Sequence, residues 1–249
     1  MIDLETQRKW LPLARLSDKP RLFCFHHAGG SAQFFRPWQQ ALQEQFDLCA
    51  IQLPGRWARM REPAYRSAQQ AAAATHEALE PLFQPPYLLF GHSLGALIAF
   101  ELSRRLAEAK IPAPARLIVS GCRNPRSGFD DPGVEKFTDE QLRQHVLSFG
   151  MLPQAIIDQK DMLEIFLPIL RADLIAAYCY QFTGDHQVNC PLTVLGGDDD
   201  PLVPTSSLTG WRDFCSAEHW REPRVFAGDH FYLTQHQQAL LDEISAPEI

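Results

Sequence analysis

The clearest chemical signal in this chain is a short glycine-flanked segment, Gly91-His92-Ser93-Leu94-Gly95. It follows the pattern G-x-S-x-G, in which a serine nucleophile stands at the tip of a sharp turn between a strand and a helix. Such a turn strains the serine backbone, and only glycine-sized residues fit two positions to either side. The helix that follows directs its first N–H groups toward any oxyanion that forms. The motif therefore predicts that Ser93 is a nucleophile in acyl transfer.

Two later loops supply the groups that such a serine needs. His230 follows the last apolar run of the chain and is the predicted general base. Asp200 follows the preceding apolar run and is the predicted carboxylate, with its neighbour Asp199 as the alternative. The chain order of Ser93, Asp200 and His230 is the order typical of α/β-hydrolases. In these roles the histidine takes the serine proton, and the carboxylate holds the imidazole in the required tautomer.

A glycine-rich loop near the N-terminus is the candidate for the rest of an oxyanion hole. The segment 26–31 (HHAGGS) follows an apolar run directly, and the backbone of such a loop can approach a ligand closely. We assign the two oxyanion donors to the backbone N–H groups of Ala28 and Leu94. The adjacent histidines of this loop have no third ligand at a suitable spacing, so we expect no metal. The predicted chemistry needs no cofactor.

The elements that must position these groups alternate along the chain. Strands are predicted at 21–25, 48–53, 87–90, 116–120, 191–195 and 224–226, and helices at 33–45, 67–83, 94–109 and 235–244. Alternation of this kind predicts a parallel sheet with helices on both faces. We therefore expect an α/β-hydrolase fold with a mostly parallel central sheet.

The alternation is interrupted between about 123 and 188. Helices are predicted there from Thr138, at 155–166 and at 167–180, and many of their residues are apolar. An insertion at the end of the sheet that carries the nucleophile suits a lid, whose apolar faces would line a pocket for an acyl chain. We expect one domain over 1–249 with this helical lid inserted.

Three arginines, Arg56, Arg59 and Arg61, follow the Pro-Gly turn after the second predicted strand. Such a cluster can bind a phosphate or an acidic partner. The alternative is a solvated charged face without a ligand.

Composition limits the classes of protein to which the chain can belong. The chain has 249 residues, 45% of them hydrophobic, and a net charge of −7, which argues against a nucleic-acid partner. No run of 18 apolar residues predicts a membrane span, and the first residues lack the apolar core of a signal peptide. Six cysteines are scattered singly, as in reduced proteins. We expect a cytoplasmic monomer that binds neither nucleic acid nor membrane.

Five motifs resemble signatures of the type II thioesterases of nonribosomal peptide and polyketide pathways. They lie at 23–31, 52–56, 91–95, 170–173 and 228–231, so the resemblance spans nearly the whole chain. Two positions depart from the family pattern: His26 stands where proline is usual, and Leu94 where methionine is common. Neither departure removes a catalytic group, but His26 could alter the oxyanion loop.

The resemblance implies hydrolysis of wrong or stalled acyl groups from the phosphopantetheine arm of acyl- or peptidyl-carrier domains, with a siderophore pathway as the expected setting. Carrier domains are generally acidic, so docking to this acidic chain would rely on local patches such as Arg56, Arg59 and Arg61. One alternative is a general esterase, or a thioesterase of acyl-CoA or of fatty acyl carriers. Another is a catalytically silent fold that serves as a binding subunit.

Overall fold

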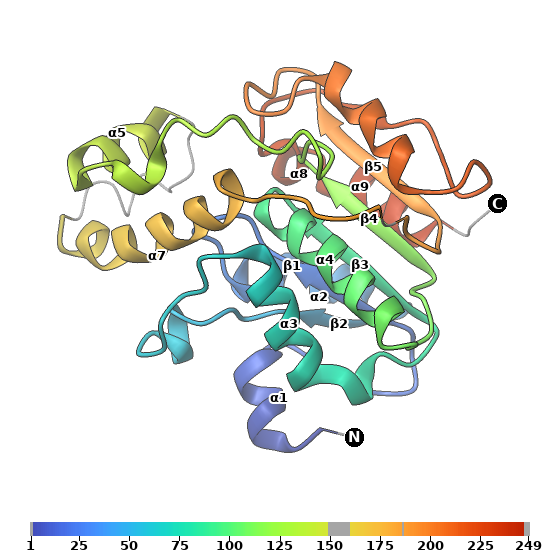
Figure 1. Cartoon of the computed structure of the whole chain (residues 1–249). Helices are drawn as coiled ribbons and strands as arrows, with labels where there is room; N and C mark the ends of the chain where they lie inside the picture. The colour runs from blue at the N-terminus through green and yellow to red at the C-terminus, as the bar shows by residue number, and fades with distance from the viewer. Residues whose placement is uncertain (1, 149–159, 186, 247–249) are drawn as a thin grey trace.

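A six-stranded sheet forms the centre of the molecule in a computed structural model, which describes residues 2–148, 160–185 and 187–246 (Figure 1). The strand order is β2-β1-β3-β4-β5-β6, and every neighbouring pair is parallel. The strands are β1 (Arg21–Phe25), β2 (Asp47–Ala50), β3 (Tyr87–His92), β4 (Arg116–Ser120), β5 (Leu192–Gly197) and β6 (Arg224–Phe226). All strands therefore present their carboxyl ends at one edge, where loops that carry functional groups can meet.

Helices cover both faces of this sheet. They are α1 (Leu4–Trp10), α2 (Arg36–Leu42), α3 (Ala68–Leu79), α4 (Leu94–Glu108), α5 (Asp139–Ser148), α7 (Lys160–Tyr178), α8 (Tyr232–Gln235) and α9 (Gln237–Ser245). Successive side chains of a strand point to opposite faces. Phe23 and Phe25 of β1 accordingly pack in one core with α3, α4 and α7, whereas Leu22 and Cys24 pack in a second core with α2 and α9. The expected α/β-hydrolase architecture is confirmed.

Most predicted elements are found, with shifted ends. The strands β1, β4 and β6 have the predicted bounds, but β2 ends at Ala50 because its pairing with β1 stops where Ala50 lies opposite Cys24. The predicted helix 33–45 is a 3-10 turn followed by α2, which has a proline in its first turn. The predicted final helix is divided at His236 into α8 and α9. Helix α1 was not predicted; Asp3 caps it and Trp10 anchors it in the core.

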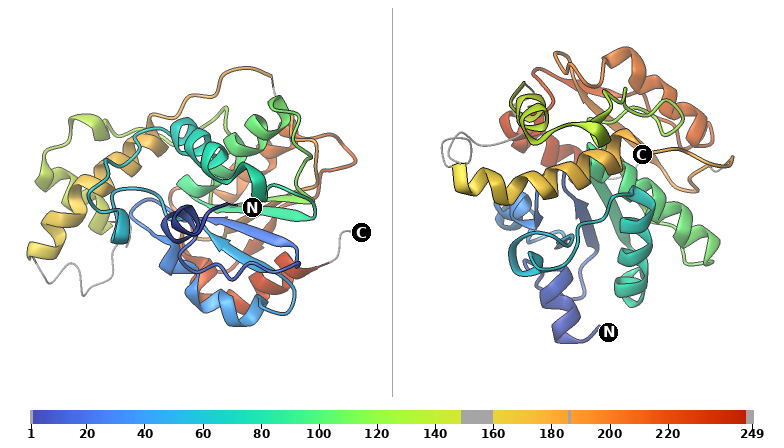
Figure 2. Two further views of the ribbon diagram at one scale, coloured as in Figure 1. Left: turned by 90° about the horizontal axis from the view of Figure 1, so that it is seen from below. Right: turned by 60° about the vertical axis from the view of Figure 1, so that its left-hand side comes forward.

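The segment between β4 and β5 contains α5 and α7, which lie together at one end of the sheet (Figures 1 and 2). Helix α5 starts with a capping box: Gln141 N–H donates to Thr138 Oγ1 at 3.2 Å, and Thr138 N–H donates to Gln141 Oε1 at 2.8 Å. No helix in the described part of the chain is long and apolar enough to span a bilayer.

Helix α7 corrects the prediction of two helices at 155–166 and 167–180. Residues 155–159 lie outside the described residues, and one helix continues through Pro168. An interior proline costs about 3 kcal/mol. Burial of Leu167, Leu170 and Leu174 offsets this cost, since each buried leucine contributes about 1.5–3 kcal/mol.

Candidate active site

The backbone around Ser93 has the geometry of a nucleophile elbow. Ser93 has φ 57° and ψ −120°, a region that non-glycine residues rarely occupy, and α4 begins at the next residue, Leu94. A Cβ atom on Gly91 would lie 2.1 Å from the carbonyl oxygen of Gly95, and one on Gly95 would lie 2.1 Å from that of Phe25. Both glycines are therefore required for the turn to form, as the motif predicts.

The loops after β5 and β6 bring Asp200 and His230 together. His230 Nδ1 lies 2.7 Å from Asp200 Oδ2, and both side chains are buried. The other carboxylate oxygen of Asp200 accepts the backbone N–H groups of Leu202 at 2.8 Å and Val203 at 3.1 Å. Asp199 is exposed. The structure therefore pairs Asp200, and not Asp199, with the histidine.

The second ring nitrogen of His230 is free to accept a proton. Because the carboxylate accepts a hydrogen bond from Nδ1, Nε2 is the nitrogen left to accept a proton. His230 Nε2 is buried with no hydrogen-bond partner among the described residues. The His230 ring lies 5.0 Å from the ring of His92, the residue before Ser93. No hydrogen bond joins Ser93 to His230 within the described part of the chain; such bonds often tighten when substrate binds.

Asp198 is a residue of this site that the sequence analysis did not single out. Its carboxylate accepts the N–H of Gly228 at 2.8 Å, and its own N–H donates to the carbonyl of Phe226 at 2.9 Å. Asp199 N–H donates to the carbonyl of Gly228 at 3.0 Å. Asp198 therefore ties the loop of Asp200 to the loop of His230. The run of three aspartates was the available signal in the sequence. In the structure Asp198 joins the two loops and Asp200 binds the histidine.

The candidate oxyanion donors come from neighbouring strands. Phe25 of β1 lies opposite Gly91 of β3, and Ala28 and Leu94 follow these two residues at the same distance along the chain. Leu94 is the first residue of α4, so its N–H has no partner within the helix. Both residues are buried. The register therefore places the two loops side by side beyond the same pair of strands.

The structure corrects the prediction that Arg56 contacts a phosphate or a carrier. Its guanidinium is 3% exposed and forms a two-pronged ion pair with Asp173 of α7, at 2.7 and 2.8 Å. It also donates to the carbonyls of Gly30 and Pro54, each at 3.1 Å. These bonds occupy the side chain inside the protein, so the prediction that Arg56 contacts a partner is wrong.

Arg59 requires the same correction. It is buried, pairs with Glu62 at 2.7 Å, donates to the carbonyl of Gln52 at 2.8 Å and stacks on Trp10 with 4.2 Å to the ring centroid. Arg61 is the one member of the predicted cluster that is exposed. The sequence placed the three arginines close together but could not separate the two structural side chains from the exposed one.

Three histidines around the elbow are buried and neutral. Burial lowers the pKa of His26 to about 3 and that of His27 to about 4, and it also lowers the pKa of His92 well below its usual value. His26 Nδ1 donates to the carbonyl of His27 at 2.8 Å, and His27 Nδ1 donates to that of Ala28 at 2.9 Å, because a carbonyl can only accept. These bonds fix the tautomers of both rings. No group of three metal-ligating side chains occurs among the described residues.

These histidines predict a loss of stability in mild acid. A neutral buried histidine stabilises the fold above its unfolded pKa of 6.5, and that contribution is lost as pH falls toward the folded value. Each such histidine should add about 1.4 kcal/mol per pH unit to the fall in unfolding free energy between pH 6 and pH 4. Denaturant unfolding at several pH values measures this slope. His26→Gln should lower this slope by about 1.4 kcal/mol per pH unit, the contribution of one histidine. An unchanged slope would contradict the conclusion that His26 is buried in its neutral form.

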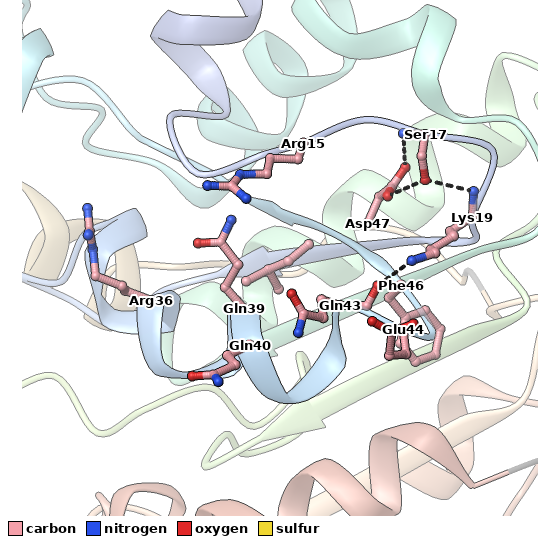
Figure 3. A pocket seen from close by; sticks show the side chains of 11 residues that line it. Arg15, Ser17, Lys19, Arg36, Gln39, Gln40, Gln43, Glu44, Phe46 and Asp47 are labelled. Carbon is pink, nitrogen blue, oxygen red and sulfur yellow. Dashed lines mark hydrogen bonds between the residues drawn. The ribbon is translucent and has the colours of Figure 1, made fainter.

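A surface pocket lies beside the edge strand β2. It is lined by Arg15, Ser17, Arg36, Gln39 and Asp47 among others, and Asp47 is the first residue of β2 (Figure 3). None of its lining residues belongs to the loops that carry Ser93, Asp200 or His230, so this pocket is not the acyl site.

Comparison with known proteins gives the family. The thioesterase domain family matches residues 20–247. The chain belongs to the thioesterase family. Gramicidin S biosynthesis protein GrsT of Aneurinibacillus migulanus is 34% identical over 236 residues, which cover 94% of this chain and 91% of that protein. The type II thioesterase BorB from the borrelidin biosynthetic cluster matches with a TM-score of 0.85 and 32% identity, covering 98% of each chain.

A mammalian thioesterase is also similar. The medium-chain S-acyl fatty acid synthase thioesterase of Rattus norvegicus is 32% identical over 218 residues, which cover 86% of this chain and 81% of that protein. The resemblance to type II thioesterases is confirmed, and the chain is a thioester hydrolase of the α/β-hydrolase fold.

Proposed function

We propose that this thioesterase removes aberrant or stalled acyl and aminoacyl groups from the phosphopantetheine arm of carrier domains in nonribosomal peptide or polyketide biosynthesis. The likeness to the type II thioesterase BorB over 98% of both chains carries the proposal. A siderophore pathway remains the expected setting. We expect a cytoplasmic protein that acts as a monomer.

The reaction proceeds through an acyl-enzyme. Ser93 Oγ attacks the thioester carbonyl while His230 Nε2 takes its proton, and Asp200 stabilises the imidazolium. The N–H groups of Ala28 and Leu94 bind the tetrahedral oxyanion, and each such donor contributes about 3–4 kcal/mol. The carbon–sulfur bond then breaks, and His230 returns the proton to the leaving sulfur. Water attacks the acyl-serine with His230 again as base, which releases the acid and regenerates Ser93. The reaction uses no cofactor.

The helices between β4 and β5 serve as the lid of this proposal, at about 123–188. The buried side chains Leu163 and Leu167 of α7 pack in the main core, and the proposal places the acyl chain against this apolar helix. Part of the predicted lid, 149–159, lies outside the described residues.

The carrier docks beside the oxyanion loop in this proposal. Trp57 is 61% exposed and Met60 is 56% exposed, and both come within four residues before the exposed Arg61. Trp57 Nε1 donates to Ser31 Oγ at 2.9 Å, which holds the indole next to the end of that loop. Tryptophan, methionine and arginine are enriched at interfaces, and Arg61 offers the positive charge that an acidic carrier requires.

Removal of this surface should affect carrier substrates selectively. Trp57→Ala and Arg61→Ala should each raise KM for an acyl-carrier by about 5- to 10-fold, because each removes one interface contact of about 1–1.4 kcal/mol. KM for the same acyl group on free pantetheine should not change. Arg15→Ala, which removes an exposed arginine of the pocket beside β2, is the matched control. Unchanged KM for the carrier in both variants would place docking elsewhere.

The function itself is tested with one acyl group presented on a phosphopantetheinylated carrier protein and on free pantetheine. The editing role predicts a much higher kcat/KM on the carrier, with Ser93→Ala as the blank. Equal values would mean a small-molecule thioesterase and would overturn the proposal.

The similarity to the rat enzyme supports a second candidate, a thioesterase of fatty acyl carriers or of acyl-CoA. A series of acyl groups from two to twelve carbons on a fatty acyl carrier separates the two functions. A strong preference for medium chains would favour the second candidate, whereas efficient removal of short acyl and aminoacyl groups would favour editing.

A further inference from the structure

A buried ion pair links the inserted helix α7 to the oxyanion loop. Asp173 on α7 and Arg56 are each 3% exposed, and they come from segments 117 residues apart in the chain. Their two parallel hydrogen bonds, at 2.7 and 2.8 Å, form the fork geometry that gives a carboxylate–guanidinium pair a fixed orientation. Because both side chains are held in place by this pair, they can also hold the backbone groups to which they are hydrogen-bonded.

Both partners hold the backbone of the oxyanion loop. Asp173 Oδ2 accepts the N–H of Gly29 at 2.7 Å, and Arg56 donates to the carbonyl of Gly30 at 3.1 Å. Leu170, one turn before Asp173 on α7, occupies the space beside Gly29, where a Cβ atom would lie 2.5 Å from its Cδ2. One helix therefore fixes this loop by charge and by close packing.

The two peptide groups on either side of the Ala28 Cα atom are held by hydrogen bonds. The carbonyl of His27 accepts hydrogen bonds from His26 Nδ1 at 2.8 Å and from the N–H of Gly30 at 3.0 Å. The carbonyl of Ala28 accepts from His27 Nδ1 at 2.9 Å, and the N–H of the same peptide, that of Gly29, donates to Asp173. In a trans peptide the N–H points opposite to the carbonyl, so the two bonds to the His27 carbonyl set the direction of the Ala28 N–H. The bonds of the Ala28 carbonyl and the Gly29 N–H fix the next peptide plane, which anchors the other side of Ala28.

We propose that Asp173 and Arg56 are positioning residues that aim the Ala28 N–H at the oxyanion. This inference rests on the proposed acyl-transfer function and assigns the pair no contact with substrate. Asp173 orients the loop, and Arg56 neutralises the carboxylate that would otherwise oppose the negative charge of the tetrahedral intermediate. Because Asp173 belongs to the insertion, the oxyanion hole is complete only with α7 seated on the loop.

The pair is tested by separating its structural role from its effect on the transition state. Asp173→Asn keeps the shape of the side chain but weakens the acceptor for Gly29. The double variant Arg56→Met/Asp173→Leu replaces the buried pair by apolar side chains, a change that proteins often tolerate without loss of stability. Arg171→Met removes another ion pair of the same helix, that with Asp139 at 2.8 Å, and is the matched control.

The substrate for this test is an acyl-pantetheine, so that the result does not depend on carrier docking. Asp173→Asn and the double variant should lower kcat on the order of 10²-fold with little change in KM, since the misplaced donor acts only in the transition state. The affinity for a trifluoromethyl ketone, whose adduct with serine carries an oxyanion, should fall by the same factor. Arg171→Met should retain wild-type values.

A double variant that folds and keeps wild-type kcat and ketone affinity would overturn the positioning role. If Asp173→Asn fails to fold, the double variant alone decides. Failure of the editing function would instead appear in the wild type, as equal activity on carrier and pantetheine, and would leave these ratios unchanged.

Discussion

Alanine at position 93 is expected to lower kcat for thioester hydrolysis by about 10⁶-fold, because the variant lacks the oxygen that forms the acyl-enzyme. The fold should persist, since the elbow depends on Gly91, Gly95 and the backbone at position 93, where alanine retains the serine backbone with a smaller side chain. Circular dichroism and thermal unfolding establish this, and steady-state release of thiol measures the activity.

A fluorophosphonate probe gives the same prediction an independent readout. It should label the wild type on the peptide that contains Ser93 and should not label Ser93→Ala. Ser206→Ala, which removes an exposed serine far along the chain, should label like the wild type. Activity of the Ser93→Ala protein above about one thousandth of wild type would contradict the assignment of the nucleophile.

Asparagine at position 200 is expected to lower kcat by about 10⁴-fold with little change in stability. The amide oxygen can still accept from the N–H groups of Leu202 and Val203, as Oδ1 of the aspartate does. The amide nitrogen, however, is a donor and faces His230 Nδ1, which favours the tautomer that carries its proton on Nε2. That tautomer cannot accept the proton of Ser93.

Asp199→Asn is the matched control for this prediction, because it makes the same chemical change one residue earlier on an exposed side chain. Its kcat should stay within about 3-fold of wild type, as expected for an exposed residue with no contact to the reacting atoms. If Asp199→Asn were the more damaging of the two, the carboxylate would have to be reassigned.

Local sequence was enough to predict the elbow and its surroundings. The restriction to glycine at 91 and 95 is a property of one turn, and the apolar runs of β1 and β4 form strands with the predicted bounds. The topology of a parallel sheet, which brings the carboxyl ends of its strands to one edge, then predicted that the serine, aspartate and histidine lie together. The choice of Asp200 over Asp199 agrees with the hydrogen bonds of the structure.

Contacts between distant segments could not be predicted in this way. Arg56 and Arg59 stand in an apparently open arginine cluster, yet Arg56 is buried by Asp173, which lies 117 residues later, and Arg59 by Trp10 of the unpredicted helix α1. A spacing rule cannot show which partner a charged side chain finds across the fold. The continuity of helix α7 through Pro168 also depends on contacts between distant segments, because its leucines are buried against the rest of the core.

The transfer of the acyl group to Ser93 is the central claim, and rapid-quench mass spectrometry tests it most directly. Wild-type enzyme is mixed with an acylated carrier protein, quenched over milliseconds to seconds and digested. The mechanism predicts a transient acyl adduct on the peptide that contains Ser93, formed as the carrier thiol is freed and decaying as the acid appears. An acyl adduct on any other peptide, or thiol release at the wild-type rate by Ser93→Ala, would contradict it.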